Sequence, residues 1–376
     1  MTSAVLKCAF VLGTRPEAIK LAPVILAMHA RPEQYRPMLW LTGQHRELLM
    51  QAFDVFGLVA DEDFALMQSN QSHADLVGNI LTRLVPLIAK QQPDWLLVQG
   101  DTSSALSGAL AAFYAGVPVV HVEAGLRTYD LSAPFPEEGN RQMISRIARL
   151  HCAPTLRAVH QLRSEKIAAN CIVQTGNTVV DAVRWVANRY TSLSDLPVPW
   201  NDDCRWVLTT LHRRESFGAP MLGMLQAIRT LADDKSLNLT FIFPVHPNPN
   251  IWQKAYEILG GHPRIVLLAP LSYPKLVAVL HRCWLVLTDS GGLQEEAPSL
   301  HKPVLVLRDV TERPEGIETG AAELVGTDPL ALIASVRRIA TELDRYERMA
   351  NAANPYGDGG AANAILAAIQ AKDPND

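Results

Sequence analysis

Cysteine is scarce in this sequence, and the few cysteines present form no motif. The 376 residues include five cysteines, and none of them has CxxC or CxxH spacing. An odd, dispersed set argues against a disulfide framework, and the missing spacing argues against a zinc site. We therefore expect free thiols, as in a protein of the reducing cytoplasm, and no metal.

The sequence also lacks an excess of basic charge and a long unbroken hydrophobic run. It has 34 basic and 38 acidic residues, so neither a nucleic-acid partner nor a membrane surface is indicated. The longest apolar tract, residues 105–120, contains Ser107, two glycines and Pro118, which argues against a membrane span. The N-terminus has no basic region, so we interpret residues 5–12 as a buried strand rather than as a signal peptide.

Short aliphatic or β-branched runs alternate with longer helical patterns along almost the whole chain. This alternation is typical of parallel sheets with helices on both faces. Two such series, before and after about residue 190, predict an α/β protein of two Rossmann-like domains whose parallel sheets face a deep cleft. The expected strands are 5–12, 38–42, 95–99, 118–122, 171–174, 206–210, 240–245, 265–268, 285–288 and 303–307.

Three acidic positions follow or flank predicted strands in the first half of the chain: Asp101, Glu123 and Glu137, or its neighbour Glu138. The carboxyl ends of parallel strands meet at the ligand crevice, where several acids indicate proton transfer. Helix capping is the competing interpretation, and it is strongest for Asp101. Glu123 is harder to explain this way, because a carboxylate beside a buried strand is costly without a partner or a purpose.

A basic turn follows the first predicted strand. Residues 13–20 (GTRPEAIK) open a helix with proline, and Arg15 and Lys20 would favour a phosphate or pyrophosphate there. An ordinary strand-to-helix turn with surface charges is an equal alternative. Because this is not the GxGxxG fingerprint, a nicotinamide cofactor is not indicated.

A second candidate turn follows a strand of the second half. In residues 289–296 (DSGGLQEE), Ser290, Gly291 and Gly292 can bring backbone amides close to phosphate oxygens, and Glu296 can accept hydrogen bonds from ribose hydroxyls. A capping turn is the alternative. His212 and His246 also follow strands; each is weak evidence alone for a titratable group at a phosphate site.

These motifs together resemble the non-hydrolysing UDP-N-acetylglucosamine 2-epimerases. The resemblance implies a GT-B-like fold, with a catalytic domain at 1–175, a UDP-binding domain at 176–357 and a C-terminal helix at 358–376 that packs back on the first domain. The matching motifs are 13–17 (GTRPE), 42–45 (TGQH), 100–102 (GDT), 123–127 (EAGLR), 136–138 (PEE), 212–215 (HRRE), 289–292 (DSGG), 311–315 (TERPE) and 325–328 (VGTD).

The resemblance implies a reaction as well. UDP is eliminated across C1–C2 to give 2-acetamidoglucal, and is then added back with the C2 proton on the other face. No cofactor is needed; the partners are UDP-N-acetylglucosamine and UDP. By resemblance, the catalytic residues are Asp101, Glu123, Glu137 and His212, and the substrate-binding residues are Arg15, Lys20, Arg141, Ser290, Gly291, Gly292, Glu296 and Arg313.

Many relatives bind a second UDP-N-acetylglucosamine as an activator, and they are commonly homodimers. The positions that match the activator site are Gln44, His45, Gln71, Arg213 and His246. Asn70 stands where some relatives have arginine, and Leu276 stands where relatives often have a phenylalanine near the uracil.

Four alternatives stay open from the sequence. The chain could epimerise a related UDP sugar such as a diacetamido uronic acid, release free N-acetylmannosamine as a hydrolysing epimerase, transfer sugar as a GT-B glycosyltransferase, or act as an idle sugar-nucleotide sensor. Simple transfer does not require the three acids Asp101, Glu123 and Glu137.

Overall fold

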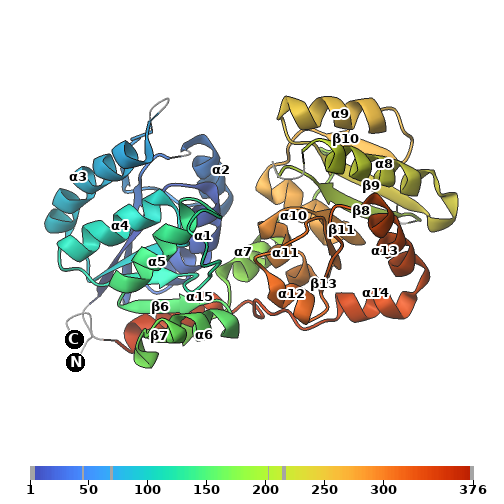
Figure 1. Cartoon of the computed structure of the whole chain (residues 1–376). Helices are drawn as coiled ribbons and strands as arrows, with labels where there is room; N and C mark the ends of the chain where they lie inside the picture. The colour runs from blue at the N-terminus through green and yellow to red at the C-terminus, as the bar shows by residue number, and fades with distance from the viewer. Residues whose placement is uncertain (1–4, 45, 68–70, 202, 214–216, 373–376) are drawn as a thin grey trace. The chain divides into compact units, whose positions relative to one another are not determined.

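The chain folds into two α/β units, each built on one sheet of parallel strands (Figure 1). The structure is a computed structural model that describes residues 5–44, 46–67, 71–201, 203–213 and 217–372. The first unit comprises Met1–Ala182 and Tyr356–Asp376, and the second comprises Val183–Pro355. The first limit falls inside helix α7 (Thr178–Ala187), whereas the sequence places it before that helix. The predicted α/β class with two Rossmann-like units is confirmed.

In the sheet of the first unit, the direction in which successive strands are added reverses between β1 and β4. Its strand order is β3-β2-β1-β4-β5-β6-β7, and every described pairing is parallel. The chain moves outward from β1 in one direction and then returns to build β4 on the other side. Ligands of such sheets bind at the carboxyl ends beside this switch point. The strands are β1 (Leu6–Leu12), β2 (Tyr35–Leu41), β3 (Glu62–Asp63), β4 (Trp95–Gln99), β5 (Val119–Val122), β6 (Leu150–Ala153) and β7 (Ile172–Gln174).

Helices cover this sheet and begin at recognisable caps. Thr102 accepts a hydrogen bond from the Ala105 amide at the start of α4, and Ser72 does the same for Asp75 at the start of α3. The last helix, α15, packs against α1, and Tyr35 Oη donates to the Leu366 carbonyl at 3.2 Å. Besides α7, the helices are α1 (Arg15–His29), α2 (Arg46–Phe56), α3 (His73–Gln91), α4 (Ser103–Tyr114), α5 (Glu137–Ile147), α6 (Leu156–Ser164) and α15 (Ala361–Gln370), with a 3₁₀ turn η1 (Ala169–Cys171).

The second unit repeats the same design. Its parallel strands follow the order β10-β9-β8-β11-β12-β13, with the switch point between β8 and β11. Its strands are β8 (Arg205–Thr210), β9 (Leu239–Pro244), β10 (Ile265–Leu268), β11 (Leu285–Thr288), β12 (Val304–Val306) and β13 (Ala322–Leu324). Its helices are α8 (Ala219–Asp233), α9 (Pro249–Leu259), α10 (Tyr273–Arg282), α11 (Gly291–Glu296), α12 (Pro314–Glu318), α13 (Pro329–Thr341) and α14 (Leu343–Ala350), with 3₁₀ turns η3 (Lys235–Leu237) and η4 (Pro298–Leu300). Among the residues described, no helix is long and apolar enough to cross a membrane.

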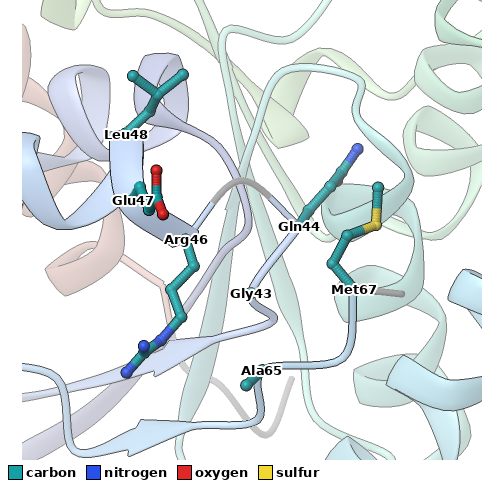
Figure 2. Close-up of a pocket in the computed structure, with 7 residues that line it drawn as sticks. All are labelled: Gly43, Gln44, Arg46, Glu47, Leu48, Ala65 and Met67. Carbon is teal, nitrogen blue, oxygen red and sulfur yellow. The ribbon is translucent and has the colours of Figure 1, made fainter. Parts of the chain in front are cut away.

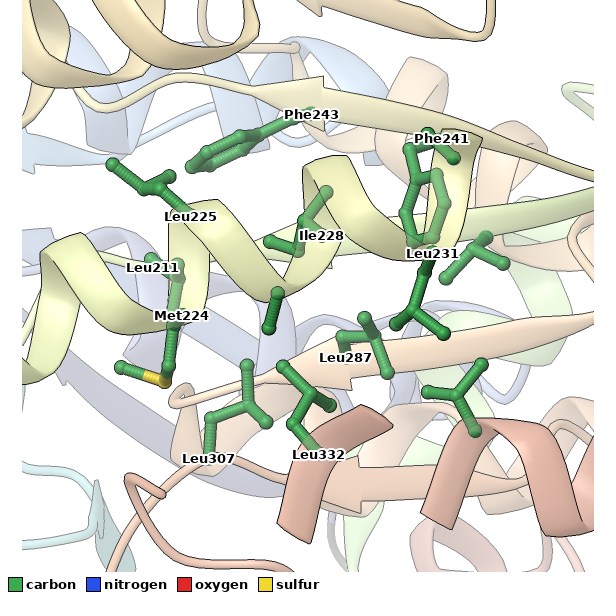
Figure 3. Close-up of a cluster of buried hydrophobic side chains, with 14 of the residues drawn as sticks. Leu211, Met224, Leu225, Ile228, Leu231, Phe241, Phe243, Leu287, Leu307 and Leu332 are labelled. Atoms are coloured by element: carbon green, nitrogen blue, oxygen red, sulfur yellow. The ribbon is translucent and has the colours of Figure 1, made fainter. Parts of the chain in front are cut away.

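Phe241 belongs to the hydrophobic core of the second unit. It is fully buried on β9 and belongs to a cluster that includes Ile228 and Leu231 of α8 and Leu287 of β11 (Figure 3). Truncating a buried phenylalanine removes apolar contacts and leaves a cavity. We expect Phe241→Ala to lower the free energy of unfolding of this unit by about 3–5 kcal/mol, measured by urea denaturation.

The control for this prediction is the same change at an exposed position. Phe113 on α4 is 55% exposed, so Phe113→Ala is expected to change stability by less than about 1 kcal/mol. Equal losses of unfolding free energy in the two variants would show that burial does not determine how much Phe241 stabilises the fold.

Candidate functional site

Glu123 lies at the carboxyl end of β5, close to the switch point of the first sheet. It is 8% exposed, and its carboxylate accepts hydrogen bonds from Lys20 Nζ at 2.6 Å and from the Gln99 side-chain amide. Its φ is +64°, a left-handed conformation that is uncommon outside glycine. The chain therefore turns out of the strand at Glu123, while partners from α1 and β4 hold the side chain. Lys20, predicted as a phosphate contact, lies against this acid.

Asp101 follows β4 and forms an ion pair with Arg141 of α5. The Arg141 Nη2 to Asp101 Oδ2 distance is 2.6 Å, and Asn140 Nδ2 donates to the Asp101 carbonyl at 2.8 Å. Thr102, rather than Asp101, caps α4. The capping interpretation of Asp101 is therefore wrong: its carboxylate belongs to an ion pair at the strand end.

Glu137 and Glu138 have different surroundings at the start of α5. Glu138 is fully buried, whereas Glu137 is half-buried and, within the described ranges, makes no hydrogen bond or ion pair. The structure therefore gives Glu138 a supporting role and leaves the Glu137 carboxylate available to a ligand. The groups around the Glu138 carboxylate are Thr128 N at 3.0 Å, Tyr129 N at 3.1 Å, Gln142 Nε2 at 2.7 Å and Arg141 Nη1 at 3.3 Å.

The surroundings of Glu138 predict a pH dependence. Burial raises the pKa of Glu138, but its hydrogen-bond donors and Arg141 outweigh burial and hold this pKa below its ordinary value. A lowered folded-state pKa contributes stability above the unfolded-state pKa of about 4.3, and this contribution is lost as the pH falls through the folded-state pKa. We expect Glu138→Gln to be less stable than the wild type by about 1–3 kcal/mol at pH 7, with a smaller difference in acid.

The measurement is the free energy of urea unfolding at a series of pH values, with Glu137→Gln as the control. Glu137 lacks these partners, so its variant is expected to follow the wild type throughout. A difference between Glu138→Gln and the wild type that grows on acidification would contradict the direction of the shift.

Arg15 is the first residue of α1, directly after the turn that follows β1. It is half-buried and, in the part of the chain that the structure describes, has no side-chain partner. The turn amides are less available: Glu17 Oε2 accepts from Gly13 N at 2.7 Å and from Thr14 N at 2.6 Å. An anion at this turn would therefore be bound chiefly by the Arg15 side chain.

His212 forms a tightly held pair with Asp289 at the switch point of the second sheet. His212 Nδ1 lies 2.8 Å from Asp289 Oδ1, and Asp289 Oδ2 accepts from the His212 and Arg213 amides at 2.7 and 2.8 Å. The ring of His246 stacks on that of His212, with centroids 6.1 Å apart. With Nδ1 directed to the carboxylate, Nε2 is the nitrogen left to meet a ligand.

Asp289 was not among the predicted site residues. It is fully buried; burial raises its pKa, but the His212 side chain and the two amides outweigh burial, so its pKa lies below the ordinary value. The sequence contained a signal for this residue, because an acid directly after β11 faces whatever follows the neighbouring strand β8. The local sequence alone predicts only the start of a glycine-rich turn there.

The glycine-rich turn after β11 lies beside Arg313. A Cβ at Gly291 would lie 3.4 Å from Arg313 Cζ, an ordinary contact distance, so the guanidinium lies close beside this turn. Arg313 Nε donates to the buried Glu295 at 3.0 Å, a second residue absent from the prediction. The turn also brings together the predicted residues Ser290, Gly292 and Glu296 on α11 or its cap.

A cavity of about 410 Å³ lies in the first unit (Figure 2). Gln44 lines it, and Ser104 Oγ of α4 donates to Gln44 Oε1 at 2.9 Å. His45 lies outside the described residues, and Gln71 is half-buried. The other lining residues are Gly43, Arg46, Glu47, Leu48, Ala65 and Met67.

The chemistry available to the two units is that of carboxylates, a histidine and cations. Among the described residues, no group of three or more histidine, cysteine or acidic side chains could hold a metal ion. The first unit supplies two acids that can exchange protons, Asp101 and Glu123. The second unit supplies His212, whose Nδ1 lies against Asp289, and a glycine-rich turn beside Arg313.

Two Rossmann-like units with titratable groups at their switch points define an enzyme of the nucleotide-binding α/β class. The chain belongs to the UDP-N-acetylglucosamine 2-epimerase family, whose model matches residues 27–370. The UDP-N-acetylglucosamine 2-epimerase of Salmonella typhimurium is 43% identical over 372 residues, which cover 97% of this chain and 98% of that protein. The Bacillus subtilis enzyme of the same name is 43% identical over 96% of this chain and 94% of its own length.

A solved structure supports the same assignment. The UDP-GlcNAc 2-epimerase from Neisseria meningitidis, bound to UDP-GlcNAc, matches with a TM-score of 0.89 and 39% identity, covering 98% of this chain and 100% of that one. The family resemblance found in the sequence motifs is thereby confirmed.

Proposed function

We propose that this protein interconverts UDP-N-acetylglucosamine and UDP-N-acetylmannosamine by non-hydrolysing epimerisation at C2. The observation that carries the proposal is the placement of Glu123 and Asp101 at the switch point of the first sheet, each held by a cation. Family membership supports the sugar nucleotide, and the acids support proton transfer at carbon.

The mechanism requires groups that move protons and groups that retain UDP. The C2 proton is not next to a carbonyl, so a base removes it as the C1–O bond to UDP breaks, which gives 2-acetamidoglucal. An acid then delivers a proton to the other face of C2, and UDP forms its bond to C1 again. We assign the proton transfers to Asp101, Glu123, Glu137 and His212. The groups we assign to substrate binding are Arg15, Lys20, Arg141, Ser290, Gly291, Gly292, Glu296 and Arg313.

Fixed donors and cations favour this chemistry. The Lys20 ammonium lies 2.6 Å from Glu123; it orients this buried carboxylate and offsets its charge. On the second unit, Arg313 and the turn around Gly291 offer a cation and close backbone for the diphosphate, which carries negative charge as it departs. The reaction needs no cofactor and no metal.

Deuterium exchange tests the proposal. Incubation with UDP-N-acetylglucosamine in deuterated buffer is expected to place deuterium at C2 of both epimers, detected by NMR. Protium retained at C2 would refute the mechanism. The same spectra distinguish the alternatives: free N-acetylmannosamine indicates a hydrolysing epimerase, and faster turnover of a diacetamido uronic acid nucleotide indicates the related sugar. Transfer to an acceptor without exchange indicates a glycosyltransferase.

We also propose that the protein is a cytoplasmic homodimer that substrate can activate. The cavity lined by Gln44 supports a second ligand site in the first unit. By family resemblance, we also propose that His45, Gln71, Arg213 and His246 take part in activation. Initial rates that depend sigmoidally on substrate, and become hyperbolic in Gln44→Ala, are the expected result. Light scattering checks the dimer.

A further inference from the structure

Glu17 is a buried carboxylate with an unusually complete set of donors. It is fully buried in the first turn of α1, and Oε2 accepts from the amides of Gly13 and Thr14 and, at 2.9 Å, from Thr14 Oγ1. Thr14 and Glu17 form a capping box, which accounts for this oxygen and for the start of the helix.

The second carboxylate oxygen makes a contact that a capping box does not require. Glu17 Oε1 accepts from Thr102 Oγ1, 85 residues further along the chain. Thr102 is the cap of α4, where the same hydroxyl oxygen accepts from the Ala105 amide at 3.0 Å. One carboxylate therefore joins the first turns of two helices.

The topology explains why these two turns meet. Strands β1 and β4 are neighbours, with Phe10 opposite Leu97, and they flank the switch point. The turns that follow them lie at the same edge of the sheet. The packing there is close: a Cβ at Gly13 would fall 2.0 Å from Ser104 Oγ of α4.

Each of the two turns carries a residue that we assign to the reaction. Arg15 directly follows Thr14, and Asp101 directly precedes Thr102. Arg141 holds the Asp101 side chain at 2.6 Å. The Glu17–Thr102 hydrogen bond fixes the next residue of the backbone. Burying a carboxylate is costly, and burial raises the pKa of Glu17 although its donors oppose the shift. Those donors come from the segments that bear Arg15 and Asp101.

We propose that Glu17 is a positioning residue, whose carboxylate sets Asp101 and Arg15 relative to each other by holding Thr102 and Thr14 together. This inference rests on the proposed function, because it takes Asp101 and Arg15 as parts of the reacting site. Glu17 itself is enclosed by its donors and does not act on substrate.

The test is a set of threonine variants. Thr102→Val removes the hydroxyl at constant shape, Thr102→Ser retains it, and Thr155→Val is a matched control, because Thr155 caps α6 in the same way through the Ala158 amide at 3.2 Å. Misplacement of a catalytic group by about 1 Å can cost about 10²-fold in rate. We expect Thr102→Val and Glu17→Gln to lower kcat for C2 exchange about 10- to 100-fold.

Rescue separates positioning from stability. Both valine variants lose a helix cap and are expected to lose about 1 kcal/mol of stability, but only Thr102→Val loses exchange, and Thr102→Ser restores kcat to within about threefold. Equal kcat in Thr102→Val and Thr155→Val, or wild-type kcat in Glu17→Gln, overturns the inference. The wild-type protein is assayed first. If it shows no C2 exchange, the proposed function is refuted, and the variants are not compared.

Discussion

Replacing Glu123 with glutamine is expected to lower C2 proton exchange by about 10²–10⁴-fold, the usual contribution of a positioned general acid or base. Glutamine has nearly the same shape, and its carbonyl oxygen can still accept from Lys20, which lies 2.6 Å from the native carboxylate. The substitution therefore removes proton transfer with little change in packing. UDP affinity is expected to stay within about threefold, because the groups we assign to UDP are mostly on the second unit.

Glu165 provides a matched control for this prediction. Its carboxylate also pairs with a buried cation, Arg127, at 2.6 Å in the same unit. Glu165→Gln is expected to lower stability but to keep exchange within about threefold of wild type. Near-normal exchange in Glu123→Gln would remove Glu123 from the proton transfers. A comparable loss in Glu165→Gln would show that disrupting any buried ion pair has this effect.

The sequence predicts strands that form continuous apolar runs well, and it misses strands without such a run. Strands β4, β10 and β11 have the predicted limits, because each is a continuous apolar run that the sheet buries. The sequence patterns do not predict β3, β6 and β13, which contain two, four and three residues. Their pairing comes from neighbours, as when Glu62 aligns with Trp40, and no local pattern encodes it.

The site divides in the same way. Strand ends predict Asp101, Glu123 and His212 as candidates, because the position after a strand is recognisable from the local sequence. Their pairings could not be predicted: the sequence indicates Arg141 only as a substrate-binding residue and omits Asp289, because both reach their partners through helix placement and sheet order. The ambiguity between adjacent acids at 137 and 138 has a similar cause: neighbouring helical residues point about 100° apart, and only packing decides which one is buried.

Asp289→Asn is expected to lower C2 exchange by about 10²–10⁴-fold, although the Asp289 side chain is fully buried. Asp289 Oδ1 lies 2.8 Å from His212 Nδ1, so a proton on Nδ1 faces the carboxylate and Nε2 is the nitrogen that we assign to the substrate. Asparagine can instead donate its amide to Nδ1, which moves the ring proton to Nε2 and reverses its hydrogen-bonding role. The carbonyl oxygen of asparagine can still accept from the His212 and Arg213 amides, so the loop is expected to keep its conformation.

A double-mutant cycle tests whether Asp289 acts through His212. If it does, the double variant Asp289→Asn with His212→Gln loses no more exchange than His212→Gln alone, because residues that act as a unit are not additive. Losses that multiply would mean that Asp289 affects the reaction by another route. Asp309→Asn is the control, since Asp309 also accepts a backbone amide in this unit, from Thr327 at 3.2 Å, and has no histidine partner among the described residues. Its exchange rate is expected to match the wild type, and the cycle then measures the orientation of His212 rather than the loss of a carboxylate.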